Sequence, residues 1–316
     1  MTQLDPRLDP EIAVLLQFLD SSGAPPMHAG TPEQARAGFR TLSVDLRDPA
    51  TVPDVASVVD RTVPGGDGDL PARVYRPHEG PLPTVLLFHG GGWVIGDLDT
   101  HDVMARTIAN LADCVVVSVD YRLAPEHPHP AAVDDALAAA RWAAGHLDEL
   151  GGADRLGVAG DSAGGNLAAI VAQVLRDEGT PLAGQLLVYP ATDFTGEHPS
   201  RAENGEGYFL DTATMLWFAE QYVGQLAGEE LTDPRISPLY GDLAGVAPAV
   251  VVVAQFDPLR DEGTAYAEAL RKAGVPVQLR AYDGLIHGFV EMGGLCRAAK
   301  SAVEDTCRMF HDVLHP

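Results

Sequence analysis

The chain has 316 residues, of which 46% are hydrophobic and 21% charged, so it can bury a sizeable core and intrinsic disorder is excluded. Its 45 acidic and 21 basic side chains give a net charge of -24, which disfavours nucleic acid and anionic lipid surfaces as partners. No apolar run approaches the ~18 residues that span a bilayer, and no basic region precedes an apolar one at the start. We therefore expect a cytoplasmic protein without stable membrane insertion.

The chain begins with two amphipathic patterns and then two weak strands. Apolar residues recur with a helical period in Pro10–Leu19 and in Pro32–Thr41, so both are predicted helices. Weak strand patterns follow near Val55–Arg61 and Ala72–Arg76. These elements precede the regular part of the chain.

From about residue 84, short β-branched runs alternate with longer helical patterns. This alternation predicts an α/β fold, in which a parallel sheet is covered by helices. Several runs are apolar nearly throughout, as expected for strands buried on both faces. The predicted strands are Thr84–Phe88, Cys114–Asp120, Leu156–Ala159, Gln185–Tyr189, Ala249–Gln255 and Val277–Tyr282. The predicted helices lie near residues 102–112, 130–148, 165–177, 260–273 and 297–314.

Residues 193–240 interrupt this alternation with a long excursion between two strands. The excursion contains a predicted helix near Thr212–Val223 that is rich in large apolar side chains. Because a structureless loop of this length is uncommon in a compact domain, the excursion is predicted to be a lid or cap.

Ser162 lies in a G-x-S-x-G sequence between a predicted strand and a predicted helix. A serine in a sharp strand-to-helix turn needs small neighbours two positions away on each side, and Gly160 and Gly164 supply them. Such a turn exposes the hydroxyl above the sheet edge and aims the N-terminus of the next helix at it. The sequence therefore predicts a nucleophilic serine; a glycine-rich turn without chemistry is the alternative.

A second motif, His89-Gly90-Gly91-Gly92-Trp93, directly follows a predicted strand. Acyl transfer needs N–H donors aimed at the oxyanion, and a polyglycine backbone can turn close enough to a substrate to supply them. We predict Gly91 and Gly92 as donors, joined by the amide of Ala163. His89 precedes the loop, so we expect it to hold the loop by hydrogen bonds.

The acid and the base should follow the serine in the chain order serine, acid, histidine. His287 comes directly after a predicted strand, whereas the later histidines lie in or beyond the last helix. Asp257 ends the preceding strand, and Pro258 keeps it out of helical geometry. We therefore predict that His287 is the base and that Asp257 orients it. Asp261, Glu262 and Asp193 stay open as alternative acids.

Taken in this order, HGGGW, YRLAPEHPHPA (Tyr121–Ala131), GDSAGG, DPLRDEG and HGF resemble the motifs of the bacterial hormone-sensitive-lipase-like esterases, also called family IV lipolytic enzymes. The similarity runs from about residue 60 to the C-terminus. It implies an α/β-hydrolase fold with a mostly parallel, eight-stranded sheet. It also implies a helical cap made of residues 1–45 and 193–240, with the core in residues 46–192 and 241–316.

The resemblance further implies a serine carboxylesterase that hydrolyses short- to medium-chain esters through an acyl-enzyme on Ser162. No cofactor and no metal are expected, and the partner is a small-molecule ester. Homodimers through the edge of the last strand, near Pro276–Tyr282, are also implied. The resemblance assigns a triad of Ser162, Asp257 and His287 and an oxyanion hole of Gly91, Gly92 and Ala163. Candidate walls of the substrate pocket are Trp93, Tyr189, Phe209 and Trp217, the last two being equally well explained as core residues.

Two alternatives remain open. An amidase, peptidase or lactonase would use the same triad, because esters and amides share the tetrahedral intermediate. A non-catalytic small-molecule receptor is the other, since the plant gibberellin receptors resemble this family. Such receptors lose the triad histidine, whereas His287 is present here.

Other polar groups receive no catalytic role. The three cysteines lack C-x-x-C spacing, so neither a disulfide framework nor a zinc site is predicted from them. Arg122 and Glu126 follow a buried strand and are predicted to brace the neighbouring loops. The pair His127 and His129 lacks an obvious third metal ligand.

Overall fold

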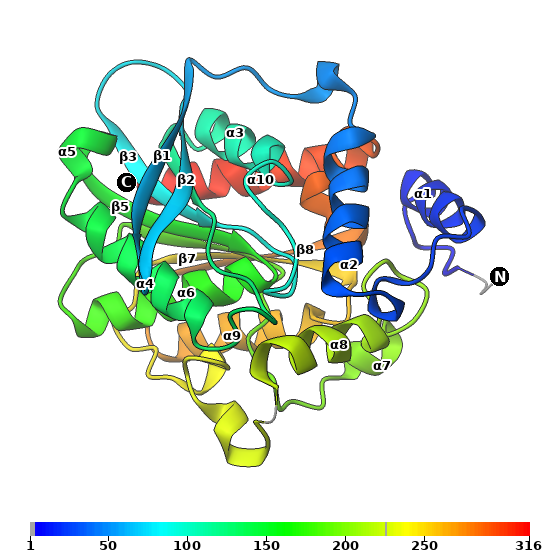
Figure 1. Cartoon of the computed structure of the whole chain (residues 1–316). Coiled ribbons are helices and arrows are strands. Elements are labelled where there is room, and N and C mark those ends of the chain that lie inside the picture. The colour runs from blue at the N-terminus through cyan, green and yellow to red at the C-terminus, as the bar shows by residue number, and fades with distance from the viewer. Residues whose placement is uncertain (1–3, 225) are drawn as a thin grey trace.

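The computed structural model describes residues 4–224 and 226–316. Within this part of the chain, eight strands form one sheet in the order β1-β2-β4-β3-β5-β6-β7-β8, with helices on both faces (Figure 1). All neighbouring strands are parallel except for the two pairings of β2, with β1 and with β4. The predicted α/β fold with a mostly parallel, eight-stranded sheet is therefore confirmed.

The strands are β1 (Ser57–Gly65), β2 (Gly68–Arg76), β3 (Leu82–Phe88), β4 (Val115–Val119), β5 (Gly152–Asp161), β6 (Gly184–Val188), β7 (Ala249–Phe256) and β8 (Val277–Ile286). The helices are α1 (Pro10–Ser21), α2 (Pro32–Arg40), α3 (Asp102–Leu111), α4 (Ala131–Ala144), α5 (Leu147–Leu150), α6 (Ala163–Asp177), α7 (Pro199–Glu203), α8 (Thr212–Val223), α9 (Arg260–Lys272) and α10 (Arg297–Leu314).

The central strands are apolar because both of their faces are covered. Every residue of β3, β4 and β6 is buried. One apolar cluster joins the sheet to α4, α6 and α9, and a second joins the opposite face to α3 and α10. Phe88 at the end of β3 is paired with Val119 of β4 and with Gly160 of β5. The carboxyl ends of these parallel strands therefore meet at one edge, where ligands bind in open α/β sheets.

Several predicted elements differ from the observed ones in their bounds or their continuity. The two weak strands are longer than predicted and form a hairpin, because much of β1 faces solvent and its apolar pattern is faint. The predicted helix 130–148 is broken into α4 and α5 at Gly145, whose amide caps the first of them. Strand β8 continues to Ile286, so that His287 follows the strand directly.

Two segments outside the alternating core lie against each other. The Nδ1 atom of His28, between α1 and α2, lies 3.1 Å from the hydroxyl of Thr214 in α8. Helix α1 is capped by Asp9, whose amide donates to the carbonyl of Gly284, three residues before His287. Within the described chain, no helix combines the length and the apolar composition that a bilayer crossing requires.

Candidate active site

Ser162 occupies the turn between β5 and α6. Its backbone has φ 53° and ψ -116°, a conformation that L-residues rarely adopt and that a surrounding structure must hold in place. Glycine is required at the flanking positions, because a Cβ on Gly160 would strike the backbone of Gly164. A Cβ on Gly164 would in turn strike the carbonyl of Phe88. The close packing of these backbones fixes the serine at the edge of the sheet.

Ser162, His287 and Asp257 form a continuous chain of hydrogen bonds. The Oγ atom of Ser162 lies 3.0 Å from Nε2 of His287, and Nδ1 of His287 lies 2.8 Å from Oδ2 of Asp257. Asp257 is fully buried and its Oδ1 accepts from the amide of Leu259 at 2.7 Å. Because a carboxylate can only accept, Nδ1 carries the proton and Nε2 presents its lone pair to the serine.

The three alternative acids are engaged elsewhere. Asp193 lies 2.9 Å from Nε2 of His198. Asp261 accepts from the amide of Ser200 at 2.8 Å, and Glu262 accepts from the amide of Thr192 at 2.8 Å. The structure therefore brings Asp257 alone of the four to His287.

The glycine loop after β3 lies against the start of α6. Gly91 and Gly92 have φ values of 116° and 58°, which favour glycine. None of the amides of Gly91, Gly92 and Ala163 donates a hydrogen bond to another part of the described chain. Free N–H groups are costly to bury unless a ligand or water accepts them. These amides are therefore available to an oxyanion formed beside Ser162.

A buried polar contact that the sequence did not predict joins the serine turn to the glycine loop. Oδ1 of Asp161 accepts from the amide of Gly90 at 2.8 Å and lies 3.4 Å from Nε2 of His101. Burial works to raise the pKa of the Asp161 carboxyl, but His101 and the Gly90 amide lower it overall. The residue before Ser162 thus holds the loop that carries the free amides. The aspartate in GDSAGG was visible in the sequence, but nothing there linked it to Gly90.

His89 lies beneath the same loop and is fully buried. Its Nδ1 donates to the carbonyl of Gly90 at 2.8 Å, and its ring stacks on Tyr121 with centroids 4.3 Å apart. The Tyr121 hydroxyl donates to the His89 carbonyl at 2.7 Å. Burial lowers the pKa of His89 to about 4, which keeps the ring neutral near pH 7.

The four predicted pocket residues lie in different surroundings. Trp93 is 4% exposed and stacks on Tyr222 of α8, with centroids 4.3 Å apart. Tyr189 is buried with its ring centroid 4.4 Å from that of His287. Phe209 is 39% exposed, and a Cβ on Gly288, the residue after His287, would lie 3.3 Å from its ring. Trp217 is partly buried, and its ring lies beside that of Phe218.

Helix α8 covers the glycine loop through Phe218, another contact that the sequence did not predict. A Cβ on Gly92 would strike the Phe218 ring, so the two residues touch only because position 92 is glycine. Phe218 is also largely buried. Residues 193–240 therefore lie directly on the glycine loop that carries the free amides.

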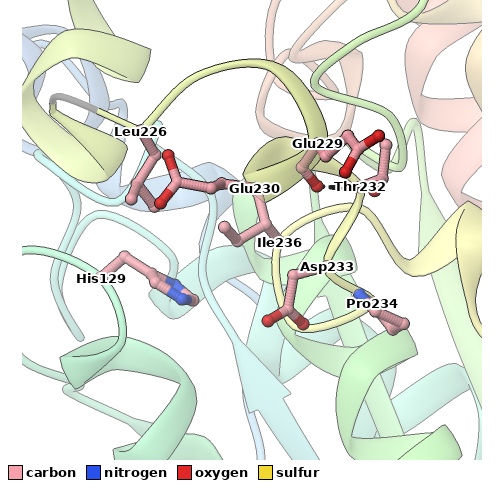
Figure 2. A pocket seen from close by; sticks show the side chains of 8 residues that line it. All are labelled: His129, Leu226, Glu229, Glu230, Thr232, Asp233, Pro234 and Ile236. Atoms are coloured by element: carbon pink, nitrogen blue, oxygen red, sulfur yellow. Dashed lines mark hydrogen bonds between the residues drawn. The ribbon is translucent and has the colours of Figure 1, made fainter.

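A hollow of about 590 Å³ lies beside His129, and none of the predicted site residues lines it (Figure 2). Nδ1 of His129 lies 3.4 Å from the Tyr222 hydroxyl. The side opposite His129 is acidic. The lining residues are His129, Leu226, Glu229, Glu230, Thr232, Asp233, Pro234 and Ile236.

The chain resembles known hydrolases over nearly its whole length. A family model described as an alpha/beta hydrolase fold matches residues 85–291. The carboxylic ester hydrolase LipN of Mycobacterium tuberculosis is 47% identical over 82% of this chain and 70% of its own. An ethyl acetate hydrolase of Pseudomonas putida is 40% identical over 92% of this chain and 95% of its own. The crystal structure of LAE6, an alpha/beta hydrolase enzyme from the metagenome of Lake Arreo, has a TM-score of 0.93 at 40% identity and covers 99% of this chain and 100% of its own.

A nucleophile turn, a hydrogen-bonded histidine and a glycine loop at the carboxyl edge of a parallel sheet define the class of α/β-hydrolases. The chain belongs to this alpha/beta hydrolase family, which confirms the resemblance inferred from its motifs.

Proposed function

We propose that the protein is a serine carboxylesterase that hydrolyses short- to medium-chain carboxylic esters. The observation that carries this proposal is the chain Ser162–His287–Asp257, with contacts of 3.0 and 2.8 Å, beside three free backbone amides. The printed names of the similar proteins, a carboxylic ester hydrolase and an ethyl acetate hydrolase, support the same reaction.

In the first half of the reaction, Nε2 of His287 takes the proton of Ser162 as Oγ attacks the ester carbonyl. The buried carboxylate of Asp257 orients the ring and stabilises the imidazolium that forms. The amides of Gly91, Gly92 and Ala163 donate to the oxyanion of the tetrahedral intermediate, each such donor being worth ~3 kcal/mol of barrier. His287 then protonates the departing alcohol, which leaves an acyl group on the serine.

In the second half, His287 takes a proton from water, which attacks the acyl-enzyme, and returns it to Oγ as the acid leaves. Every proton in this cycle moves between Ser162, His287, substrate and water. The steps therefore need no cofactor.

The cap limits which esters reach the serine. We propose that residues 1–45 and 193–240 form it, because α8 lies on the glycine loop through Phe218 and touches the N-terminal segment through His28. Phe209, beside Gly288, and Tyr189, beside His287, are proposed walls of the acyl site. A covered site of this kind favours acyl groups short enough to fit under α8.

Hydrolysis of p-nitrophenyl esters from acetate to laurate tests the proposal, with the p-nitroanilide of the best acid alongside. We expect maximal kcat/KM at a short or medium chain and little anilide hydrolysis. A rate for the anilide equal to that for the ester would favour the amidase alternative. If folded protein hydrolyses none of the esters, the receptor alternative would be favoured.

Asp161→Ala is expected to lower kcat by about 10-fold or more with little change in KM. The substitution removes the shorter hydrogen bond of the Gly90 amide and leaves only the contact with Nε2 of His101 at 3.3 Å. The oxyanion donors that follow Gly90 are then held less firmly, and small misplacements of this kind are costly. Steady-state kinetics on the best ester measures the effect. Asp161→Asn is the matched control, because its amide oxygen can still accept from Gly90 and should restore most of kcat. An equal loss of kcat in both variants would mean that kcat depends on the charge beside His101 and not on the hydrogen bond from Gly90.

Arg36→Met is expected to destabilise the protein by about 1–3 kcal/mol, because it removes several hydrogen bonds from α2 to the loops that follow β3 and β4. Arg36 donates to the carbonyl of Val94 at 2.8 Å, to that of Ala124 at 2.9 Å, and to Glu126 at 2.6 Å. Thermal unfolding of both proteins at pH 7 measures the difference. Arg308→Met removes only an exposed pair with Glu304 and should change Tm little.

The ion pair between Arg36 and Glu126 predicts that the stability of the protein depends on pH. The Arg36 hydrogen bond lowers the pKa of Glu126 from 4.5 to about 2. The stabilisation from the ionised pair is therefore complete above pH 4.5 and is lost as the pH falls toward 2. The difference in Tm between wild type and Arg36→Met should narrow over this range, and a constant difference would contradict the assignment.

We also propose a homodimer and a cytoplasmic location. Among the described residues, strand β8 pairs with β7 alone, so its other edge is open to pairing with a second copy. Light scattering of the purified chain tests the dimer, and a monomer at micromolar concentration would exclude it. The three buried cysteines are free thiols, as expected in a reducing compartment.

A further inference from the structure

Three side chains near the C-terminus form a cluster that the proposed esterase reaction does not use. His311, His315 and Asp113 each offer one ligand atom, and these atoms lie within 4.8 Å of one another. His311 lies in the last turn of α10, His315 directly follows that helix, and Asp113 lies in the turn between α3 and β4. The geometry points to a surface site for a divalent transition metal ion of the zinc class, held by these three residues.

The two imidazoles are held at a fixed spacing. They are four residues apart, and the amide of His315 donates to the carbonyl of His311 at 2.9 Å, so the helical spacing extends to the second histidine. Their rings are stacked with centroids 4.5 Å apart. Histidines at positions i and i+4 of a helix lie on one face and can bind one metal ion together.

Within the part of the chain that the structure describes, each histidine has one ring nitrogen without a hydrogen-bond partner. Nε2 of His315 faces the carbonyls of Ala112 and Asp113 at 3.3 and 3.1 Å, which assigns the proton to Nε2 and leaves Nδ1 as a ligand. Nδ1 of His311 lies 3.4 Å from the Asp312 carboxylate, which leaves Nε2. Carbonyl and carboxylate partners of this kind commonly orient metal-binding imidazoles.

Asp113 is also held in place. Its backbone has φ 51°, and its Oδ1 lies 2.6 Å from Nε2 of His78, so the second carboxylate oxygen remains for a metal. The side chains of Asp113 and His311 are 39% and 41% exposed, and water can therefore complete the coordination. Two imidazoles and one carboxylate suit zinc, nickel or copper, whereas magnesium and calcium prefer oxygen ligands throughout.

The site lies far from the proposed chemistry. Asp113 precedes the first residue of β4, whereas Ser162 follows the last residue of β5, and the two strands run parallel to β3 between them. The cluster and the serine therefore lie at opposite edges of the sheet. A metal ion here would tie the last helix to the α3–β4 turn and stabilise the folded chain without taking part in ester hydrolysis.

The inference is tested by titrating zinc chloride into full-length protein that carries no tag and has been treated with a chelator. We expect calorimetry to give one more zinc ion per chain for wild type than for the double variant His311→Gln/His315→Gln. Zinc should raise Tm by about 2 °C or more in wild type and leave the double variant unchanged. Cobalt(II) should give a visible ligand-field band with wild type alone. Esterase activity of the metal-free proteins should be equal, which separates this test from that of the proposed function.

His127→Gln is the matched control, because it removes an exposed histidine outside the cluster and should bind zinc like wild type. Circular dichroism of the metal-free double variant should match wild type, since His311 and His315 are partly exposed residues at a helix end. Equal zinc stoichiometry in wild type and the double variant would overturn the site. So would the absence of binding to wild type at micromolar zinc.

Discussion

Replacing Ser162 by alanine is expected to lower kcat for ester hydrolysis by about 100,000-fold while KM stays nearly constant. The variant removes the oxygen that lies 3.0 Å from Nε2 of His287, so no acyl-enzyme can form there. Binding of the ester and the free amides of the glycine loop remain, which explains a small residual rate over water. Initial rates on the best p-nitrophenyl ester measure the loss.

Ser301→Ala is the matched control, because Ser301 is an exposed residue of α10 outside the site. It should keep full activity. A phosphonate ester should label wild type and Ser301→Ala with one equivalent each, and leave Ser162→Ala unlabelled. Activity of Ser162→Ala within tenfold of wild type would remove Ser162 as the nucleophile and with it the proposed mechanism.

Asp257→Asn is expected to lower kcat by about 10,000-fold, although it preserves the shape of the site. The Leu259 amide donates to Oδ1 at 2.7 Å, so the new side chain must keep its oxygen there. Its NH2 group then faces Nδ1 of His287, which becomes an acceptor, and the ring proton moves to Nε2. A protonated Nε2 cannot take the proton of Ser162.

Asp261→Asn serves as the comparison, because Asp261 is the nearest alternative acid in the chain and accepts from Ser200 instead. It should change kcat by less than tenfold. The pH dependence of kcat/KM and thermal unfolding of both variants separate a tautomer effect from a folding defect. A larger loss in Asp261→Asn than in Asp257→Asn would overturn the assignment of the acid.

The sequence was informative about the site where chain order and strand ends decide the geometry. Parallel strands bring their carboxyl ends to one edge, so residues that follow β3, β5, β7 and β8 had to meet there. The sequence alone therefore predicts that Ser162, Asp257 and His287 lie together. The same alternation predicted a parallel sheet covered by helices, whereas the number of eight strands was implied by the resemblance to the esterase family.

Contacts between side chains far apart in the chain could not be predicted in this way. The Asp161–Gly90 hydrogen bond depends on the distance between two turns, and the Phe218–Gly92 contact depends on where α8 docks. Neither is encoded in a local period or spacing. The break of the predicted 130–148 helix at Gly145 was missed because the helical pattern continues on both sides of one glycine.

Three neighbouring residues at the end of β5 contribute to the site in different ways. Asp161 holds the glycine loop, Ser162 is the proposed nucleophile, and Ala163 offers a free amide. An insertion or deletion of one residue here would disrupt all three at once. The excursion 193–240 also packs on the core, but it leaves the sheet after β6 and rejoins it before β7, so its length can change without shifting the strand ends. Descendants of this sequence can therefore acquire new acyl preferences by gaining or losing residues in the excursion, whereas the five residues Gly160–Gly164 must keep their length.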